Sequence, residues 1–180
     1  MTTSDNGIAM GQFFEGFSAT PNNDPDGNAQ VGYGCRLHSG PVDDCGLCSH
    51  YKANPLTPQQ GDAMYRQHVR EICEPRLNRL LATFPLTQNQ YDALSDFVYN
   101  EGDFTNDTEP GKFKSNHLII CFREGRLNDV PDQLMRWVYG DGKVLPGLVR
   151  RRTAEVQMWQ WGTWQAYAVP ARTQGAASGN

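Results

Sequence analysis

The sequence lacks long apolar segments and blocks of basic residues. Its apolar runs, such as residues 118–122, fall far short of the ~20 residues that a helix needs to cross a bilayer. Lys and Arg total 16 against 20 Asp and Glu, which gives a net charge of −4, and no basic run is longer than residues 150–152. A nucleic-acid backbone binds to a broad basic surface. We therefore expect neither a membrane span nor a nucleic-acid partner.

A secretory signal is also missing from the start of the chain. Residues 1–10 contain no Lys or Arg and no apolar core, whereas a signal peptide has both. We therefore expect any export of this chain from the cytoplasm to use another route.

The composition is otherwise that of a folded protein. Of the 180 residues, 38% are hydrophobic and 20% are charged, which is close to the balance of ordinary globular proteins. The length suits a single domain. We expect one compact unit of two lobes, and neither a repeat array nor a long disordered region.

Capping residues mark several helices along the chain. Residues 57–60 and 87–90 each read Thr, two residues, Gln, which is the pattern of a capping box. Ser4 or Asp5 can cap a first helix, and Pro75 is expected to stop or kink the second. The expected helices cover residues 4–15, 57–73, 76–82, 87–101, 115–125, 131–137 and a segment that starts at 146.

A different pattern lies between the first two helices. Residues 17–37 contain Pro and Gly at a density that excludes a helix, and residues 24–28 have the composition of a tight turn. This region predicts a β-hairpin or a small sheet, so the expected fold class is α+β. The small lobe covers about residues 16–56. The helical lobe covers about 57–167 together with 4–15, and a flexible tail follows at 168–180.

Two carboxyl groups are expected near the junction between the first helix and the sheet. Glu15 lies among Phe13, Phe14 and Phe17, and Asp24 lies in the predicted turn. An apolar setting raises the pKa of one carboxyl, while a polar turn keeps the other ionised. Such a pair can cleave a glycosidic bond, although an ordinary helix end followed by a turn has the same appearance.

A series of motifs in a fixed order makes the glycosidase interpretation specific. The chain resembles the phage-type lysozymes of glycoside hydrolase family 24 over about residues 8–167. The resemblance is carried by residues 14–17 (Phe-Glu-Gly-Phe), 24–27 (Asp-Pro-x-Gly), 31–34 (Val-Gly-Tyr-Gly), 85–94, 97–100, 136–137, 142–152 and 162–167.

This resemblance implies a fold, a substrate and a reaction. The fold would be a single lysozyme-like domain over residues 1–167, with a cleft between the two lobes. The substrate would be bacterial peptidoglycan, cut by an N-acetylmuramidase at the β-1,4 bond between N-acetylmuramic acid and N-acetylglucosamine with inversion at the anomeric carbon. The resemblance implies no cofactor and no metal.

The family's catalytic signature is Glu, eight residues, Asp or Cys, five residues, Thr. Glu15 and Asp24 match it, and Gln30 stands where the family has threonine. A second departure is Cys35, at the position of a common histidine. A glutamine amide both donates and accepts hydrogen bonds, so we expect Gln30 to help Asp24 to orient a water molecule while Glu15 acts as the general acid.

The resemblance also suggests which side chains bind the substrate. By analogy, three residues line the wall of the small lobe and three line the helical side. These residues are Tyr33, Gly34 and Arg36, and Tyr99, Asn100 and Asn116.

The five cysteines leave three interpretations open. Cys35, Cys45 and Cys48 lie in a polar insertion that also contains His38 and His50. These are ligand types of a tetrahedral zinc site, but the same cysteines could form disulfides in an oxidising compartment or stay as free thiols. We expect a structural role, with disulfides favoured. Two further cysteines lie in predicted helices, where they are expected to be small buried hydrophobes or a mutual pair: Cys73 and Cys121.

Alternatives in function and setting also stay open. The second function class is a catalytically weak lysozyme-like module that binds peptidoglycan, and a glycosidase acting on chitin is a third. The chain is expected to act as a monomer at the bacterial cell wall or in the periplasm. It would be delivered as a phage endolysin through lysis or a holin, or by a dedicated secretion system as the lysozyme domain of a secreted effector. The acidic pI of about 5.5 favours the effector, which an immunity protein could inhibit.

Overall fold

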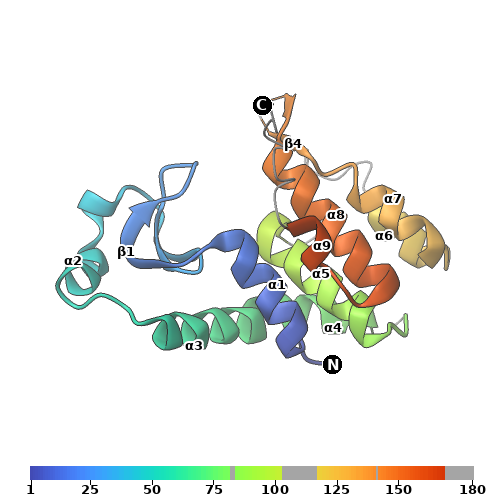
Figure 1. Cartoon of the computed structure of the whole chain (residues 1–180), viewed down its shortest axis with the longest axis horizontal. Helices are drawn as coiled ribbons and strands as arrows, with labels where there is room; N and C mark the ends of the chain where they lie inside the picture. The colour runs from blue at the N-terminus through green and yellow to red at the C-terminus, as the bar shows by residue number, and fades with distance from the viewer. Residues whose placement is uncertain (82–83, 103–116, 141, 169–180) are drawn as a thin grey trace, which may run out of the picture.

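A computed structural model describes residues 1–81, 84–102, 117–140 and 142–168. It confirms the α+β class (Figure 1). A three-stranded antiparallel sheet in the order β1-β2-β3 forms one end of the molecule, and helices form the other. The helices are α1 (Asp5–Glu15), α2 (Gly46–Ala53), α3 (Pro58–His68), α4 (Glu74–Leu81), α5 (Gln88–Glu101), α6 (His117–Arg123), α7 (Val130–Leu134), α8 (Pro146–Trp161) and α9 (Gln165–Ala168). The strands are β1 (Ser18–Asn23), β2 (Ala29–Gly32), β3 (Cys35–His38), β4 (Tyr139–Gly140) and β5 (Lys143–Val144).

The helix starts predicted at Ser4, Thr57 and Thr87 are confirmed, whereas the start predicted at Ser115 lies outside the described residues. Ser4 caps α1 by accepting a hydrogen bond from the backbone N–H of Gly7. Both capping boxes are present, one at the start of α3 and one at the start of α5. These signals lie within a few residues of each other in the chain, so the sequence alone specifies them.

The predicted hairpin over residues 17–37 is confirmed and extended to three strands. β1 pairs with β2, and β2 pairs with β3, both antiparallel. The first turn closes through Gly27, at a φ of 84°, where glycine avoids the steric cost that a Cβ would add. The polar, cysteine-bearing insertion, for which the sequence predicted no helix or strand of its own, contains the helix α2.

Pro75 does not end the helical segment that starts at α3. The chain continues through a π-helical turn, Val69–Cys73, directly into α4. Proline lacks an N–H and its ring clashes with the carbonyl four residues earlier in a regular α-helix. A π-turn changes the hydrogen-bond register just before the proline, which allows the helical path to continue.

The C-terminal half also departs from prediction in one place. The helix expected over residues 131–137 is only α7, Val130–Leu134, because the chain then turns into the short hairpin of β4 and β5. The turn predicted over 139–144 is this hairpin. Of the expected tail at 168–180, residues 169–180 lie outside the described part of the chain.

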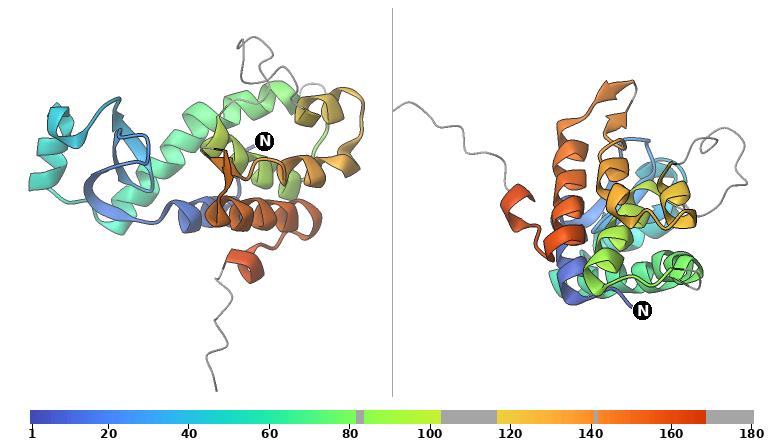
Figure 2. Two further views of the ribbon diagram at one scale, coloured as in Figure 1. Left: turned by 90° about the horizontal axis from the view of Figure 1, so that it is seen from above. Right: turned by 90° about the vertical axis from the view of Figure 1, so that its right-hand side faces the viewer.

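The hydrophobic core lies in the helical part. α5 crosses its centre, with residues 91–98 all buried, and α1, α4 and α8 surround it (Figures 1 and 2). α3 runs between the sheet and this helical body (Figure 1). Within the described ranges no helix combines the length and the apolar character needed to cross a membrane.

Candidate active site

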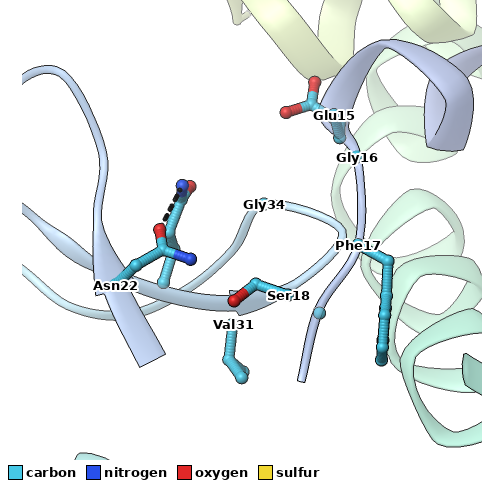
Figure 3. A pocket seen from close by; sticks show the side chains of 9 residues that line it. Glu15, Gly16, Phe17, Ser18, Asn22, Val31 and Gly34 are labelled. Carbon is cyan, nitrogen blue, oxygen red and sulfur yellow. Dashed lines mark hydrogen bonds between the residues drawn. The ribbon is translucent and has the colours of Figure 1, made fainter. Parts of the chain in front are cut away.

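Glu15 lies at the point where the helical body meets the sheet. It is the last residue of α1, and Gly16 follows it at a φ of 68°. The Glu15 side chain is 19% exposed and lines a pocket of about 250 Å³ (Figure 3). The other lining residues are Gly16, Phe17, Ser18, Asn22, Gln30, Val31, Gly32 and Gly34. The ring of Phe17 points away from this pocket (Figure 3).

The pKa of Glu15 results from two opposing effects. Burial raises it by disfavouring the charged carboxylate. The guanidinium of Arg151 opposes this effect, since its Nη1 donates to Glu15 Oε1 at 2.6 Å. Burial is the larger effect, so the pKa lies above the ordinary value for glutamate. A carboxyl in this state can carry a proton for transfer to a substrate oxygen.

Arg151 is itself held by a second carboxylate. Its Nε and Nη2 donate to the two oxygens of Asp96 at 2.9 and 2.8 Å. Arg151 and Asp96 are both buried. A bidentate pair fixes the orientation of the guanidinium, so Asp96 on α5 determines where Arg151 on α8 meets Glu15.

Gly34 makes room for the Glu15 carboxyl. Its φ is +70°, and a Cβ at this position would lie 2.7 Å from Glu15 Oε2. We expect Gly34→Ala to displace the carboxyl and to lower the catalytic rate by at least about tenfold, in addition to a cost of about 1–2 kcal/mol for the left-handed backbone.

Gly27→Ala is the matched control for Gly34→Ala, because Gly27 also has a positive φ but a Cβ there would meet no atom within 4 Å. Thermal unfolding and steady-state kinetics of both variants separate backbone strain from displacement of Glu15. Equal activity in the two variants would contradict the role given to Gly34.

Two amide side chains form the opposite wall of the pocket. Gln30 Nε2 donates to Asn22 Oδ1 at 3.0 Å, shown by the dashed line in Figure 3. The two residues are directly paired between β2 and β1. This contact leaves the Asn22 amide nitrogen and the Gln30 carbonyl oxygen for other partners. Asn22 lies across the pocket from Glu15 (Figure 3).

Asp24 lies in the turn after β1, and it is not among the residues that line this pocket. It accepts hydrogen bonds from the backbone N–H of Asn28 at 2.8 Å and from the Asn28 amide at 3.2 Å. Arg36 Nη2 lies 3.6 Å from Asp24 Oδ2. Desolvation works to raise the pKa of Asp24, but the hydrogen bonds from Asn28 and the charge of Arg36 outweigh it and lower the pKa. Asp24 is therefore ionised at neutral pH.

The expected substrate-binding residues lie in different settings. The hydroxyl of Tyr99 donates to the backbone carbonyl of Tyr33 at 2.7 Å, and both rings pack against Tyr65. The Asn100 side chain accepts from Arg152 Nη2 at 2.7 Å. Gly34 lines the pocket and Arg36 contacts Asp24. Asn116 lies outside the described residues.

The cysteines form one disulfide, between Cys45 and Cys48, and this confirms the disulfide interpretation for that pair. Cys45 is also the N-cap of α2, so the bond stabilises the start of that helix. Cys35 is a buried free thiol 3.8 Å from the Tyr99 hydroxyl. Among the described residues no cluster of His, Cys, Asp or Glu could hold a metal ion. The helix cysteines are buried free thiols, as expected of small hydrophobes: Cys73 and Cys121.

Sequence reasoning missed three residues of the site. Arg151 was noted only as part of a basic run, and Asp96 and Asn22 were not singled out. A carboxylate in the middle of an apolar helix face was the available signal for Asp96, because a buried charge needs a partner. Asn22 gave no signal, since its place follows from the pairing of β1 with β2.

Comparisons with known proteins agree with the resemblance to phage-type lysozymes. Residues 12–155 match the family model described as phage lysozyme. The endolysin of Acyrthosiphon pisum secondary endosymbiont phage 1 is 27% identical over 164 residues, which cover 89% of this chain and 99% of that protein. The endolysin of Bacillus phage PZA is 35% identical over 108 residues, and these cover 60% of this chain and 38% of the relative.

A solved structure is similar over nearly the whole chain. It is the muramidase domain of SpmX from Asticaccaulis excentricus, which is 28% identical with a TM-score of 0.67 and coverage of 88% of this chain and 97% of that domain. Some relatives are longer proteins, since the chain spans well under half of the Bacillus phage PZA endolysin.

Proposed function

Since this chain belongs to the phage lysozyme family, we propose that it is a peptidoglycan hydrolase, an N-acetylmuramidase that cleaves the β-1,4 bond between N-acetylmuramic acid and N-acetylglucosamine. The observation that carries the proposal is a carboxyl of raised pKa, Glu15, that lines a pocket beside the sheet. The similarity to a muramidase domain and to several endolysins supports the same substrate.

In this mechanism Glu15 is the general acid. It donates its proton to the glycosidic oxygen as the bond breaks, and the oxocarbenium-like transition state develops positive charge on the sugar ring. Loss of the proton leaves a carboxylate on Glu15. Arg151 Nη1 is already 2.6 Å from Oε1, so its positive charge stabilises the carboxylate as it forms.

The second half of the mechanism concerns the attacking water. We assign Asp24, ionised in its turn, as the base and Gln30 as a residue that helps to position the water, which gives inversion. The Asn22–Gln30 pair supports this assignment, because it presents a donor and an acceptor on the wall of the pocket across from Glu15 (Figure 3). Inverting enzymes leave room for water by holding their carboxyls roughly 6.5–9.5 Å apart.

Substitutions at Asp24 and Gln30 test this division of roles. We expect Asp24→Ala to lower the catalytic rate by about 10²-fold or more, since it removes the base. Gln30→Ala should cost far less, and Gln30→Thr should retain or raise activity. Proton NMR of the first product should show the α configuration at the new reducing end. A β product, or a glycosyl ester trapped on Asp24, would contradict inversion.

The substrate is tested by the release of reducing ends. Purified peptidoglycan should yield fragments that end in N-acetylmuramic acid, and chitin should yield far fewer. Equal cleavage of chitin would identify the enzyme as a glycosidase of broader specificity rather than a muramidase. Binding to peptidoglycan with no released ends would identify the chain as a binding module.

The proposal extends to setting and partners. Residues 1–167 would act as one domain, as a monomer, on the cell wall or in the periplasm. Tyr33, Arg36, Tyr99 and Asn100 would contact the glycan strand near the pocket. Asn116, which lies outside the described residues, is proposed to bind the strand as well. Delivery by phage lysis and delivery as a secreted effector are both compatible with this activity, and an immunity protein would be a partner only in the second case.

A further inference from the structure

A cluster of buried charges lies behind Glu15, between α5 and α8. Arg151 links Glu15 to Asp96, and Arg152 Nη1 donates to Glu101 Oε1 at 3.1 Å. Arg152, Glu101 and Glu155 have no part in the mechanism proposed for Glu15. Of these three, Glu155 lies one turn further along α8, and its side chain is fully buried.

The charges in this cluster do not balance. The cluster holds two guanidinium groups against four carboxyls, from Glu15, Asp96, Glu101 and Glu155. Four other titratable groups that face it have raised pKa values and stay neutral: Tyr65, Cys73, Cys35 and Tyr99. Full ionisation would leave excess negative charge in a buried space, which is strongly unfavourable. At least one carboxyl must therefore carry a proton.

The contacts of Glu155 identify it as a protonated member. Its Oε1 lies 2.8 Å from Arg152 Nη2 and 4.0 Å from Arg151 Nε. Nevertheless, neither of its oxygens receives a well-aligned hydrogen bond from a donor in the described residues. Its carboxyl lies close enough to that of Asp96 for each to affect the pKa of the other. Two carboxylates are both acceptors, so this contact is favourable only when one of them holds a proton.

Asp96 is not the residue that holds this proton. Burial works to raise its pKa, but the guanidinium of Arg151, together with Glu155 and Arg152, outweighs burial and lowers the pKa. Burial raises the pKa of Glu155 well above the ordinary value, and its contact with Asp96 adds to the effect. The pair titrates as a unit, with the proton on the Glu155 side.

We propose that Glu155 is a positioning residue that enters the cluster as a neutral carboxylic acid and donates its proton to Asp96. This hydrogen bond holds Asp96 where both of its oxygens bind Arg151, and Arg151 is thereby aligned with Glu15. An ionised Glu155 would instead compete with Glu15 for Arg151, whose Nε is only 4.0 Å away. The inference rests on the proposed function, in which Glu15 is the general acid.

Infrared spectroscopy tests the protonation state without reference to activity. At neutral pH the protein should show the C=O stretching bands of two protonated carboxyls, one that is lost only in Glu155→Gln and one that is lost only in Glu15→Gln. A spectrum that Glu155→Gln leaves unchanged would overturn the proposal. The infrared band reports the protonation of Glu155 whichever bond the enzyme cleaves. Its absence would therefore contradict the inference about Glu155 without contradicting the proposed function.

Kinetics of two variants test the positioning role. Glutamine keeps a donor for Asp96 and an acceptor for Arg152 without a charge, so Glu155→Gln should keep the wild-type pH profile and a kcat within about twofold. Glu155→Met removes both groups at similar size. We expect its kcat to fall about tenfold or more with KM unchanged, because a buried acceptor loses its donor and Glu155 touches no substrate.

Three outcomes would overturn this role. They are a shifted pH profile in Glu155→Gln, a loss of folding in Glu155→Gln, and equal impairment of the Gln and Met variants. If Glu155→Met does not fold, the infrared band and the pH profile of Glu155→Gln still decide the question.

Discussion

Replacing Glu15 by glutamine is expected to lower peptidoglycan hydrolysis by about 10²–10⁴-fold, because an amide cannot transfer a proton to the glycosidic oxygen. The fold should survive, since glutamine is isosteric and its oxygen can still accept from Arg151. Release of reducing ends measures the loss of activity, and thermal unfolding confirms the fold.

Glu71→Gln is the matched control for Glu15→Gln. Glu71 is an exposed glutamate whose side chain accepts a hydrogen bond from Gln67 Nε2 at 3.0 Å. Its replacement should leave activity within about twofold of wild type, as expected for a surface site. Wild-type rates in Glu15→Gln, with Glu71→Gln also unaffected, would exclude Glu15 as the general acid.

Replacing Arg151 by methionine is expected to cost about 3–5 kcal/mol of unfolding free energy, because Asp96 is left as an uncompensated buried charge. Activity should also fall. Without the guanidinium, the main effect that opposes burial is lost and the pKa of Glu15 rises further. Glu15 must be protonated to act, so activity falls as rising pH removes its proton. In Arg151→Met this fall in the pH–activity profile should occur at higher pH than in wild type.

Arg150→Met and a double variant give the controls for Arg151→Met. Arg150 is the adjacent arginine on α8 and is exposed, so its loss should change stability by less than about 0.5 kcal/mol. Adding Asp96→Asn to Arg151→Met should restore part of the lost stability, because it removes the unpaired charge. Chemical denaturation measures both effects. Additive losses in the double variant would contradict the pairing of Arg151 with Asp96.

The parts of the fold that the sequence could predict are those specified by local interactions. The Thr-x-x-Gln boxes before α3 and α5 contain both partners of the capping hydrogen bonds. The prediction that Pro75 could stop the helix is wrong for a physical reason, because the effect of a proline depends on whether the preceding turn can widen. The helix α2 was also missed, since its start combines a cysteine cap with a disulfide that the spacing alone did not assign.

The candidate site also contains residues that the sequence could identify and residues that it could not. Glu15 could be identified because its neighbours in the chain are aromatic and the motif around it is specific. Its partners could not, because Arg151 follows it by 136 residues and Asp96 lies 55 residues from Arg151. Such pairings follow from the packing of α1, α5 and α8, which no local pattern encodes. The sequence suggested Gln30 through the family signature, whereas its contact with Asn22 required the strand register.

Burial raises the pKa of Glu15 and Arg151 limits the rise, and the proposed mechanism requires Glu15 to carry a proton where the enzyme acts. Carbon-13 NMR of the Glu15 carboxyl, assigned by its absence in Glu15→Gln and followed against pH, measures this directly. We predict a pKa above the ordinary glutamate value in wild type and a still higher one in Arg151→Met. A Glu15 pKa at or below the ordinary value in wild type would contradict the mechanism.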